Sequence, residues 1–166
     1  MIIYSSINVK SCVVCFIYQG PNETYTYLND KLGHYHKYVY IVDGQSTGFN
    51  TIDGVDAEEY TLVKNKLYDI SYTQGHTITT TTSDIGVGLV TFNPIPVDND
   101  ISVEILKGEQ VVDITSTDTR KTLVCLSGSL SVNGNVISTN QFATLNVGKT
   151  ASVTMGETDI CAIITG

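Results

Sequence analysis

Short runs of Val, Ile, Thr and Tyr recur along the whole chain and are separated by Gly, Asn, Asp and Pro. This alternation is typical of β-strands joined by tight turns, and the pattern predicts no helix longer than two turns. The pair Asn133-Gly134 between two alternating runs predicts a two-residue type I′ hairpin turn. In the C-terminal part the pattern predicts eight short antiparallel strands, the number of a jelly-roll sandwich, near residues 102–106, 110–116, 121–126, 129–132, 135–137, 141–145, 149–155 and 159–164.

The same order of runs and turn glycines occurs twice in the chain. A repeat of this length indicates a duplicated domain, because each copy holds enough strands to bury its own face. We therefore predict an all-β protein with a duplicated antiparallel jelly-roll β-sandwich, whose first domain spans residues 1–95 and whose second spans 98–166. The matched segments are 15–30 with 103–118, 38–44 with 122–128, and 72–90 with 145–164, in which Asp84 is set against Asp159.

Two further segments interrupt this repeat. Residues 93–100, Asn-Pro-Ile-Pro-Val-Asp-Asn-Asp, have the composition of an inter-domain linker. The first copy also carries an acidic insert at residues 48–59, which the second copy lacks. The insert has no EF-hand spacing, so we expect a solvated loop or a short helical turn there. Its carboxylates are Asp53, Asp56, Glu58 and Glu59.

The charge balance narrows the classes of partner. A net charge of −8 and a pI near 4.6 argue against nucleic acid, which needs clustered Lys and Arg. No apolar run approaches the roughly 20 residues that span a bilayer, so we expect no membrane segment. Residues 1–10 lack a basic region before their apolar residues, so we read a first strand there and no signal peptide.

The four cysteines are expected to be buried free thiols in a reducing compartment. Cys12 and Cys15 are three apart on a run that reads as a strand, so their side chains point to opposite faces and do not clamp one metal. Cys125 and Cys161 lie in apolar runs.

The stretch from Thr122 to Gly134, followed by Phe142 to Gly148, resembles a cupin: an apolar strand ends in Gly, a hairpin follows, and a short strand ends near another Gly. Residues 38–44 and 73–76 of the first copy resemble the same pattern. Together they imply a two-domain bicupin that covers nearly the whole chain. The resemblance lies in strand order and glycine placement, and it therefore bears on the fold more than on the function.

Metal-dependent cupins use two histidines one residue apart, then a Glu, and later a third histidine. The resemblance implies His34, His36 and His76 as the ligands of one transition metal, and the first two would share a face of one strand. The chain departs from the family pattern, because no Glu or Asp lies between His36 and Val42 and the second copy has no histidine. We therefore expect no bound metal and no cofactor, with this three-histidine site as the alternative.

Tyrosines concentrate in the first copy. Tyrosine is enriched at protein interfaces, although it also suits half-buried strands. The two interpretations stay open. If the first holds, the interface has an apolar centre of tyrosines and a polar rim of the insert carboxylates: Tyr35, Tyr38, Tyr40, Asp53, Asp56, Glu58 and Glu59.

No catalytic constellation is complete in the sequence. We therefore predict a non-catalytic structural or assembly protein that acts through protein partners, as a homo-oligomer or as part of a larger assembly. A phage virion accessory or decoration component is the preferred setting, located in the virion or the cytoplasm. The alternatives are a metal-dependent cupin enzyme, such as a dioxygenase or isomerase, and a small-ligand or sugar-binding cupin module.

Overall fold

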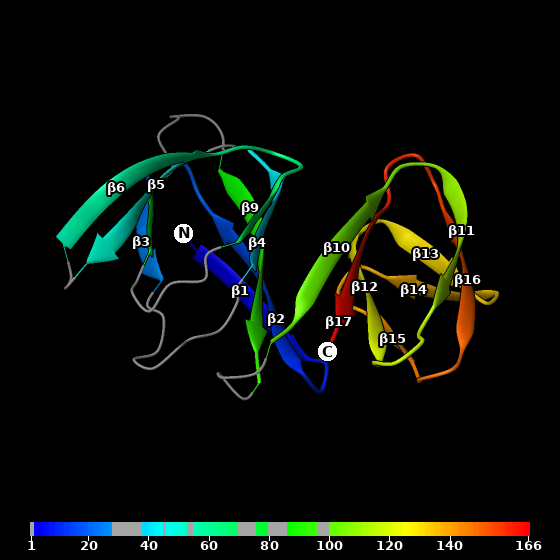
Figure 1. Cartoon of the computed structure of the whole chain (residues 1–166). Helices are drawn as coiled ribbons and strands as arrows, with labels where there is room; N and C mark the ends of the chain where they lie inside the picture. Colours follow the sequence, from blue (N-terminus) through cyan, green and yellow to red (C-terminus); the bar gives the residue numbers. More distant parts are fainter. Residues whose placement is uncertain are drawn as a thin grey trace. The chain divides into compact units, whose positions relative to one another are not determined.

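The chain divides into two compact units, Met1–Asp100 and Ile101–Gly166, drawn in Figure 1. The computed structural model describes residues 2–27, 38–44, 46–52, 55–69, 76–79, 86–95 and 100–166, and for residues 2, 24–27, 46–52, 55–60 and 76–79 it describes the backbone alone. Every regular element in these ranges is a β-strand, which confirms the all-β prediction.

The first unit contains β1 to β9. They span Ile2–Asn8, Cys12–Gln19, Thr24–Tyr27, Tyr38–Asp43, Ser46–Ile52, Val55–Leu62, Leu67–Asp69, His76–Thr79 and Val87–Pro94. The second unit contains β10 to β17. They span Ser102–Lys107, Gln110–Thr115, Lys121–Ser127, Ser129–Val132, Asn135–Ser138, Phe142–Leu145, Thr150–Met155 and Ile160–Thr165. The eight strands of the second unit lie where the alternation predicts them.

Both units have the same sheet topology. In the first unit, one sheet has the order β1-β2-β9-β4-β7 and the other β3-β8-β5-β6. In the second unit, the orders are β10-β17-β12-β15 and β11-β16-β13-β14. Strands β2 to β9 therefore correspond one to one with β10 to β17, and β1 is an addition to the first copy. All of these pairs are antiparallel, so the duplicated antiparallel jelly-roll sandwich is confirmed.

The correspondence extends to a β-bulge. The pairing of β4 with β9 shifts register between Ile41 and Asp43, and that of β12 with β17 shifts between Cys125 and Ser127. A glycine with positive φ follows each bulge, at 76° for Gly44 and 79° for Gly128. An L-residue rarely adopts this conformation, which explains why both copies end the strand with Gly.

The register also corrects one part of the sequence alignment. Ile41 pairs with Leu89, and Cys125 pairs with Cys161, so Leu89 and Cys161 are equivalent. Matching Asp84 with Asp159 instead sets Leu89 against Ile164, three residues further on. The error arose because seven residues separate the end of β8 from the start of β9, whereas four separate β16 from β17.

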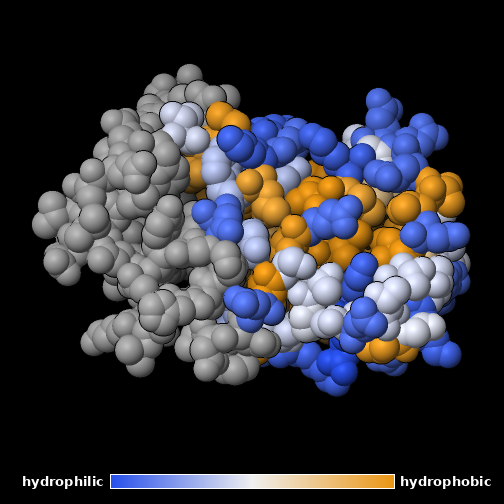
Figure 2. Space-filling model, in the orientation of Figure 1, coloured by the Kyte–Doolittle hydropathy of each residue, from blue (hydrophilic) through white to orange (hydrophobic). Residues whose placement is uncertain are grey.

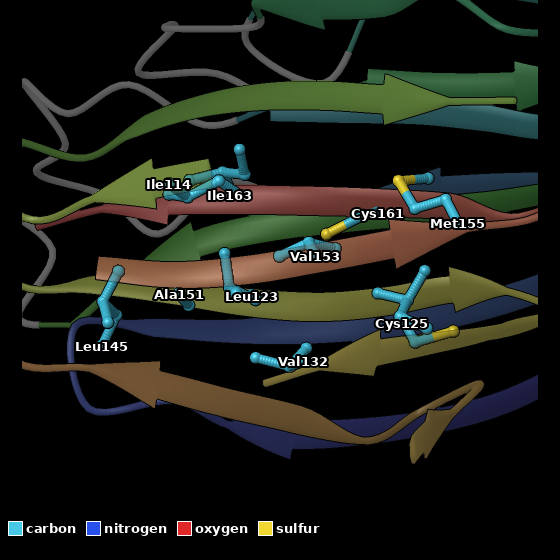
Figure 3. Close-up of a cluster of buried hydrophobic side chains, with 11 residues drawn as sticks. Ile114, Leu123, Cys125, Val132, Leu145, Ala151, Val153, Met155, Cys161 and Ile163 are labelled. Carbon is cyan, nitrogen blue, oxygen red and sulfur yellow. The ribbon is translucent and has the colours of Figure 1, made fainter. Parts of the chain in front are cut away.

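The buried cluster between the two sheets of the second unit is apolar. Figure 3 shows side chains from its two sheets pointing into the space between them. Burying apolar surface stabilises such a sandwich by about 25 cal/mol per Å². The buried cluster consists of Ile114, Leu123, Cys125, Leu130, Val132, Leu145, Ala151, Val153, Met155, Cys161 and Ile163.

The first unit has a corresponding core. Its buried cluster is formed by the inner face of the five-stranded sheet and by Leu62 of β6 in the facing sheet. The members from the five-stranded sheet are Cys15, Ile17, Val39, Ile41, Val87 and Leu89.

The acidic insert belongs to a strand pair. Residues 46–52 and 55–62 form β5 and β6, which pair antiparallel with an irregularity between Asn50 and Thr51. The expectation of a loop or a short helical turn at residues 48–59 was therefore wrong. Val55 and Ala57 alternate with Asp56 and Glu58, and such alternation is a strand signal even where the polar positions are charged.

The outer face of one sheet in the second unit carries little charge. Val111, Thr154, Ser131 and Val136 form one row across β11, β16, β13 and β14, and Val111 and Val136 are 71% and 67% exposed. Figure 2 shows further hydrophobic residues on the visible face of this unit, bordered by hydrophilic ones. Among the described residues, no helix is long and apolar enough to cross a membrane.

All four cysteines are free and buried, as expected. Burial, with a smaller effect of the neighbouring Cys125, raises the pKa of the Cys161 thiol from its ordinary 9.0 to about 12. Burial raises the pKa of Cys12 to about 12 as well. These thiols therefore remain protonated near neutral pH and are weak nucleophiles in the folded protein.

The two glycines near the β13–β14 hairpin provide a matched stability test. Gly128 and Gly134 both have positive φ, at 79° and 83°, but only at Gly128 would an added Cβ collide with the Asp159 carboxylate. That carboxylate accepts hydrogen bonds from Ser129 N at 3.1 Å and Gly156 N at 2.7 Å. We expect Gly134→Ala to lower the free energy of unfolding by about 1 kcal/mol, and Gly128→Ala by about 1–3 kcal/mol more, because it also displaces this carboxylate. Urea denaturation measures both, and equal losses would contradict the role of Asp159.

A second test concerns the buried Cys161 thiol. In the unfolded chain this thiol ionises near pH 9, whereas in the folded protein it stays neutral up to about pH 12. Its contribution to stability is therefore fully present below pH 9 and is lost as the pH rises from 9 to 12. Urea denaturation at a series of pH values should show a steeper loss of stability above pH 9 in the parent protein than in Cys161→Ala. Parallel curves would show that the thiol does not titrate differently in the two states.

Candidate functional site

Polar side chains interrupt the apolar inner face of the first unit at one end. Cys15 pairs across the strands with Thr91, and Thr91 pairs with Val39. Asn93 lies two residues further along the same face of β9. Cys15 and Thr91 are only 6% and 4% exposed, whereas Tyr4 on the adjacent β1 is 60% exposed. We call Tyr4, Cys15, Thr91 and Asn93 the polar cluster; it reaches from the rim of the sandwich into its core.

The members of the polar cluster are in direct contact. The Tyr4 hydroxyl lies 3.1 Å from Cys15 Sγ. The Asn93 side-chain amide donates to Thr91 Oγ1 at 3.0 Å, and it also reaches Cys15 Sγ at 3.7 Å. The same amide reaches Val13 O at 3.4 Å. Asn93 thus connects a thiol and a hydroxyl on neighbouring strands, and a few convergent polar groups in an apolar wall are the usual composition of a small-molecule site.

The second unit has no counterpart of this cluster. Because Leu89 and Cys161 are equivalent, Thr91 corresponds to Ile163. Ile163 is buried and belongs to the apolar core of the second unit. The two copies therefore differ in chemistry at a matched interior position.

The sequence pattern did not reveal these four residues as a group. Their assembly depends on the register between β1, β2 and β9, and β2 and β9 are far apart in the chain. The single available signal was the polar pair Thr91 and Asn93 at alternate positions of an otherwise apolar strand. That signal places both side chains on one face, but it does not reveal which residues lie opposite.

The histidines proposed as metal ligands are described only in part. His34 and His36 lie outside the described residues. His76 begins β8, and its backbone pairs with Tyr27 of β3 and Asn50 of β5. Within the described ranges, no three His, Cys, Asp or Glu side chains form a group that could hold a metal ion. By donor chemistry, three imidazoles suit a transition metal, and these three are the only histidines in the sequence.

Two of the tyrosines proposed for an interface can be placed. Tyr40 is 1% exposed, and its hydroxyl donates to Asn65 Oδ1 at 3.3 Å. Burial raises the pKa of Tyr40. Tyr38 is half-buried, and burial, then Asp69 and Asp100, raises its pKa. Tyr40 therefore offers almost no surface to a partner.

The other residues proposed for the interface lie partly outside the described residues. Tyr35 and Asp53 are in that group. Asp56, Glu58 and Glu59 lie on β6, whose residues pair with Thr51, Asn50 and Phe49 of β5. The interface around the first copy stays a prediction.

Comparison with solved structures gives an independent view of the fold. No protein-family model matches the sequence, and no curated protein sequence matches it. Several solved structures do match over nearly the whole chain. YhhW from Escherichia coli matches with a TM-score of 0.70 and 9% identity, covering 99% of this chain and 97% of that one. A cupin 2 conserved barrel domain protein from Leptotrichia buccalis matches with a TM-score of 0.58 and 12% identity, covering 99% and 88%.

Oxalate decarboxylase from Bacillus subtilis also matches. The TM-score is 0.61 at 8% identity, over 93% of this chain and 68% of that one. That protein is an enzyme, and it contains Mn(II) centres. At these identities the likeness is one of fold.

These matches correct three sequence-based predictions. The prediction of a phage virion component was wrong, because the similar structures are cupin-domain proteins and a cupin enzyme. The predictions that the protein is not an enzyme and that it has no cofactor were wrong for the same reason, since one of these similar proteins is a decarboxylase with manganese. The physical error was to read an incomplete ligand motif as evidence for a scaffold, although ligand sets vary more than the fold that carries them.

The matched topology of the two units, their shared bulges and the solved structures that they resemble lead to one conclusion: this chain has a duplicated, cupin-like fold.

Proposed function

We propose that the protein is a metal-dependent cupin enzyme that acts on a small molecule held in the first unit. The observation that carries this proposal is the polar cluster, which interrupts the interior of a sandwich whose fold resembles that of a cupin enzyme. In the second unit, the equivalent interior is filled by apolar side chains. The second unit then has a structural role.

The three histidines are the residues that would hold the metal in this proposal. His36 is two residues along the chain from Tyr38, whose cross-strand partner on β9 is Phe92. Phe92 stands between Thr91 and Asn93, so the histidine pair precedes the strand that runs beside the polar cluster. His76 begins a strand of the facing sheet. When bound, a transition metal supplies Lewis acidity toward an oxygen atom of a substrate.

The chain's own polar groups bind and orient the substrate. Thr91 is buried in the first unit and Tyr4 is exposed at its rim. Together they can contact a molecule that extends from the buried end of the polar cluster toward solvent. The surrounding residues, among them Val39 and Ile41, are apolar and buried. They exclude water and strengthen each hydrogen bond made inside.

The compartment that fits this proposal is a reducing one. All four cysteines of the chain lie within the described residues, and each is a buried free thiol. Thiols persist where disulfides are kept reduced. The cytoplasm meets that condition.

Elemental analysis of the purified protein tests the metal. We expect a stoichiometric transition metal that is lost in His36→Ala and in His76→Ala, because each substitution removes a nitrogen ligand. Thr150→Ala is the matched control, since Thr150 begins β16, the counterpart of β8. It should retain the metal. Protein that holds no transition metal, even after incubation with manganese, iron or zinc, would contradict the enzyme and favour the small-ligand module.

A further inference from the structure

Two hydrogen-bonding groups of the polar cluster lack a partner among the described residues. The Thr91 hydroxyl accepts a hydrogen bond from Asn93, but it donates none to any described residue, although Thr91 is 4% exposed. The side-chain carbonyl of Asn93, a half-buried residue, accepts none from the described part of the chain. Buried polar groups are usually paired, and leaving one unpaired costs about 1–3 kcal/mol. An unpaired donor this deep in a sandwich therefore points to a ligand that completes it.

The orientation of the Asn93 side chain follows from its neighbours. Its nitrogen faces Val13 O at 3.4 Å, and a backbone carbonyl can only accept a hydrogen bond. The nitrogen must therefore be on that side, and the carbonyl oxygen Oδ1 on the other. The contact with Val13 O thus distinguishes the two ends of the Asn93 amide.

The unpaired donor and the unpaired acceptor are neighbours. Thr91 Oγ1 is 3.0 Å from the Asn93 nitrogen, and Oδ1 is bonded to the same carbon atom as that nitrogen, so one small ligand group can reach both the Thr91 hydroxyl and the Asn93 carbonyl. A hydroxyl is such a group, because it accepts from one neighbour and donates to the other. A carboxylate can only accept hydrogen bonds. It would accept one from Thr91, but its oxygen atoms would repel the carbonyl oxygen of Asn93, which also only accepts.

We propose that Thr91 and Asn93 recognise a hydroxyl group of an uncharged small molecule, of the sugar or polyol class. This inference rests on the proposed function, because it names the substrate class of the same site. The second unit supports it by contrast, since Ile163 at the position of Thr91 offers no donor.

Binding to metal-free protein tests this proposal separately from catalysis. Glucose, mannitol and glycerol serve as neutral probes, and oxalate and succinate as carboxylate probes, with isothermal titration calorimetry on protein treated with a chelator. We expect at least one neutral probe to bind and the carboxylates to bind more weakly. Thr91→Val, which keeps the shape and removes the hydroxyl, should weaken the neutral probe about tenfold, the effect of losing one buried hydrogen bond.

Two further variants complete the experiment. Thr91→Ser keeps the hydroxyl and should retain most of the affinity, which also guards against a folding defect in Thr91→Val. Thr154→Val removes an exposed hydroxyl from the outer face of the second unit and should leave the affinity for the neutral probe unchanged.

The proposal is overturned if no neutral probe binds, if the carboxylates bind better, or if Thr91→Val binds as well as the parent. If the metal is present and Thr91→Val has no effect, the enzyme stands and this inference fails. If a neutral probe binds as expected but no metal is found, the inference stands and the enzyme fails.

Discussion

Burial of apolar side chains between two sheets is the interaction on which the rest of this structure depends. Each unit closes only because residues at alternate positions of its strands meet their counterparts from the facing sheet. A strand shifted by one residue would present its polar face to that interior. The same constraint fixes the polar cluster, because Cys15, Thr91 and Asn93 occupy inward positions of strands whose register the apolar neighbours determine.

Much of the fold could be predicted from the sequence, because strand periodicity and turn chemistry are local. The positive φ values of Asn133 and Gly134, at 50° and 83°, confirm the type I′ turn read from an Asn-Gly pair. The cupin-like resemblance, carried by glycines that end strands, was confirmed by the solved structures that the chain matches. The prediction for the acidic insert was wrong, because four carboxylates within seven residues indicate a loop, whereas the alternation that indicates a strand covers only residues 55–58.

The site was harder to predict, because it depends on contacts between distant strands. Tyr4 and Cys15 are adjacent in space, but Tyr4 lies on β1, which has no counterpart in the second unit. Cys15 and Asn93 are 78 positions apart in the sequence. Histidines and carboxylates at fixed spacing form recognisable motifs, whereas the hydroxyl, amide, phenol and thiol of the polar cluster have no sequence spacing that marks them as a site. Function was misjudged for a related reason. An incomplete metal motif shows that the ligand set differs from the family pattern. It does not show that the interior of the sandwich has lost its ability to bind a metal or a small molecule.

The added strand β1 changes which strand forms the edge of the first copy's five-stranded sheet. An unpaired strand edge is a template for pairing with another chain, and proteins protect such edges with charges or with a covering strand. In the second unit the edge strand β10 carries Glu104 and Lys107 and needs no cover. Its counterpart β2 reads Cys-Val-Val-Cys-Phe-Ile-Tyr-Gln without a single charge, and β1 pairs with it from Val13 to Gln19. The edge position of this sheet therefore passes to β1, which reads Ile-Ile-Tyr-Ser-Ser-Ile-Asn and is also uncharged. By this criterion the first copy presents a less protected edge than β10 does in the second.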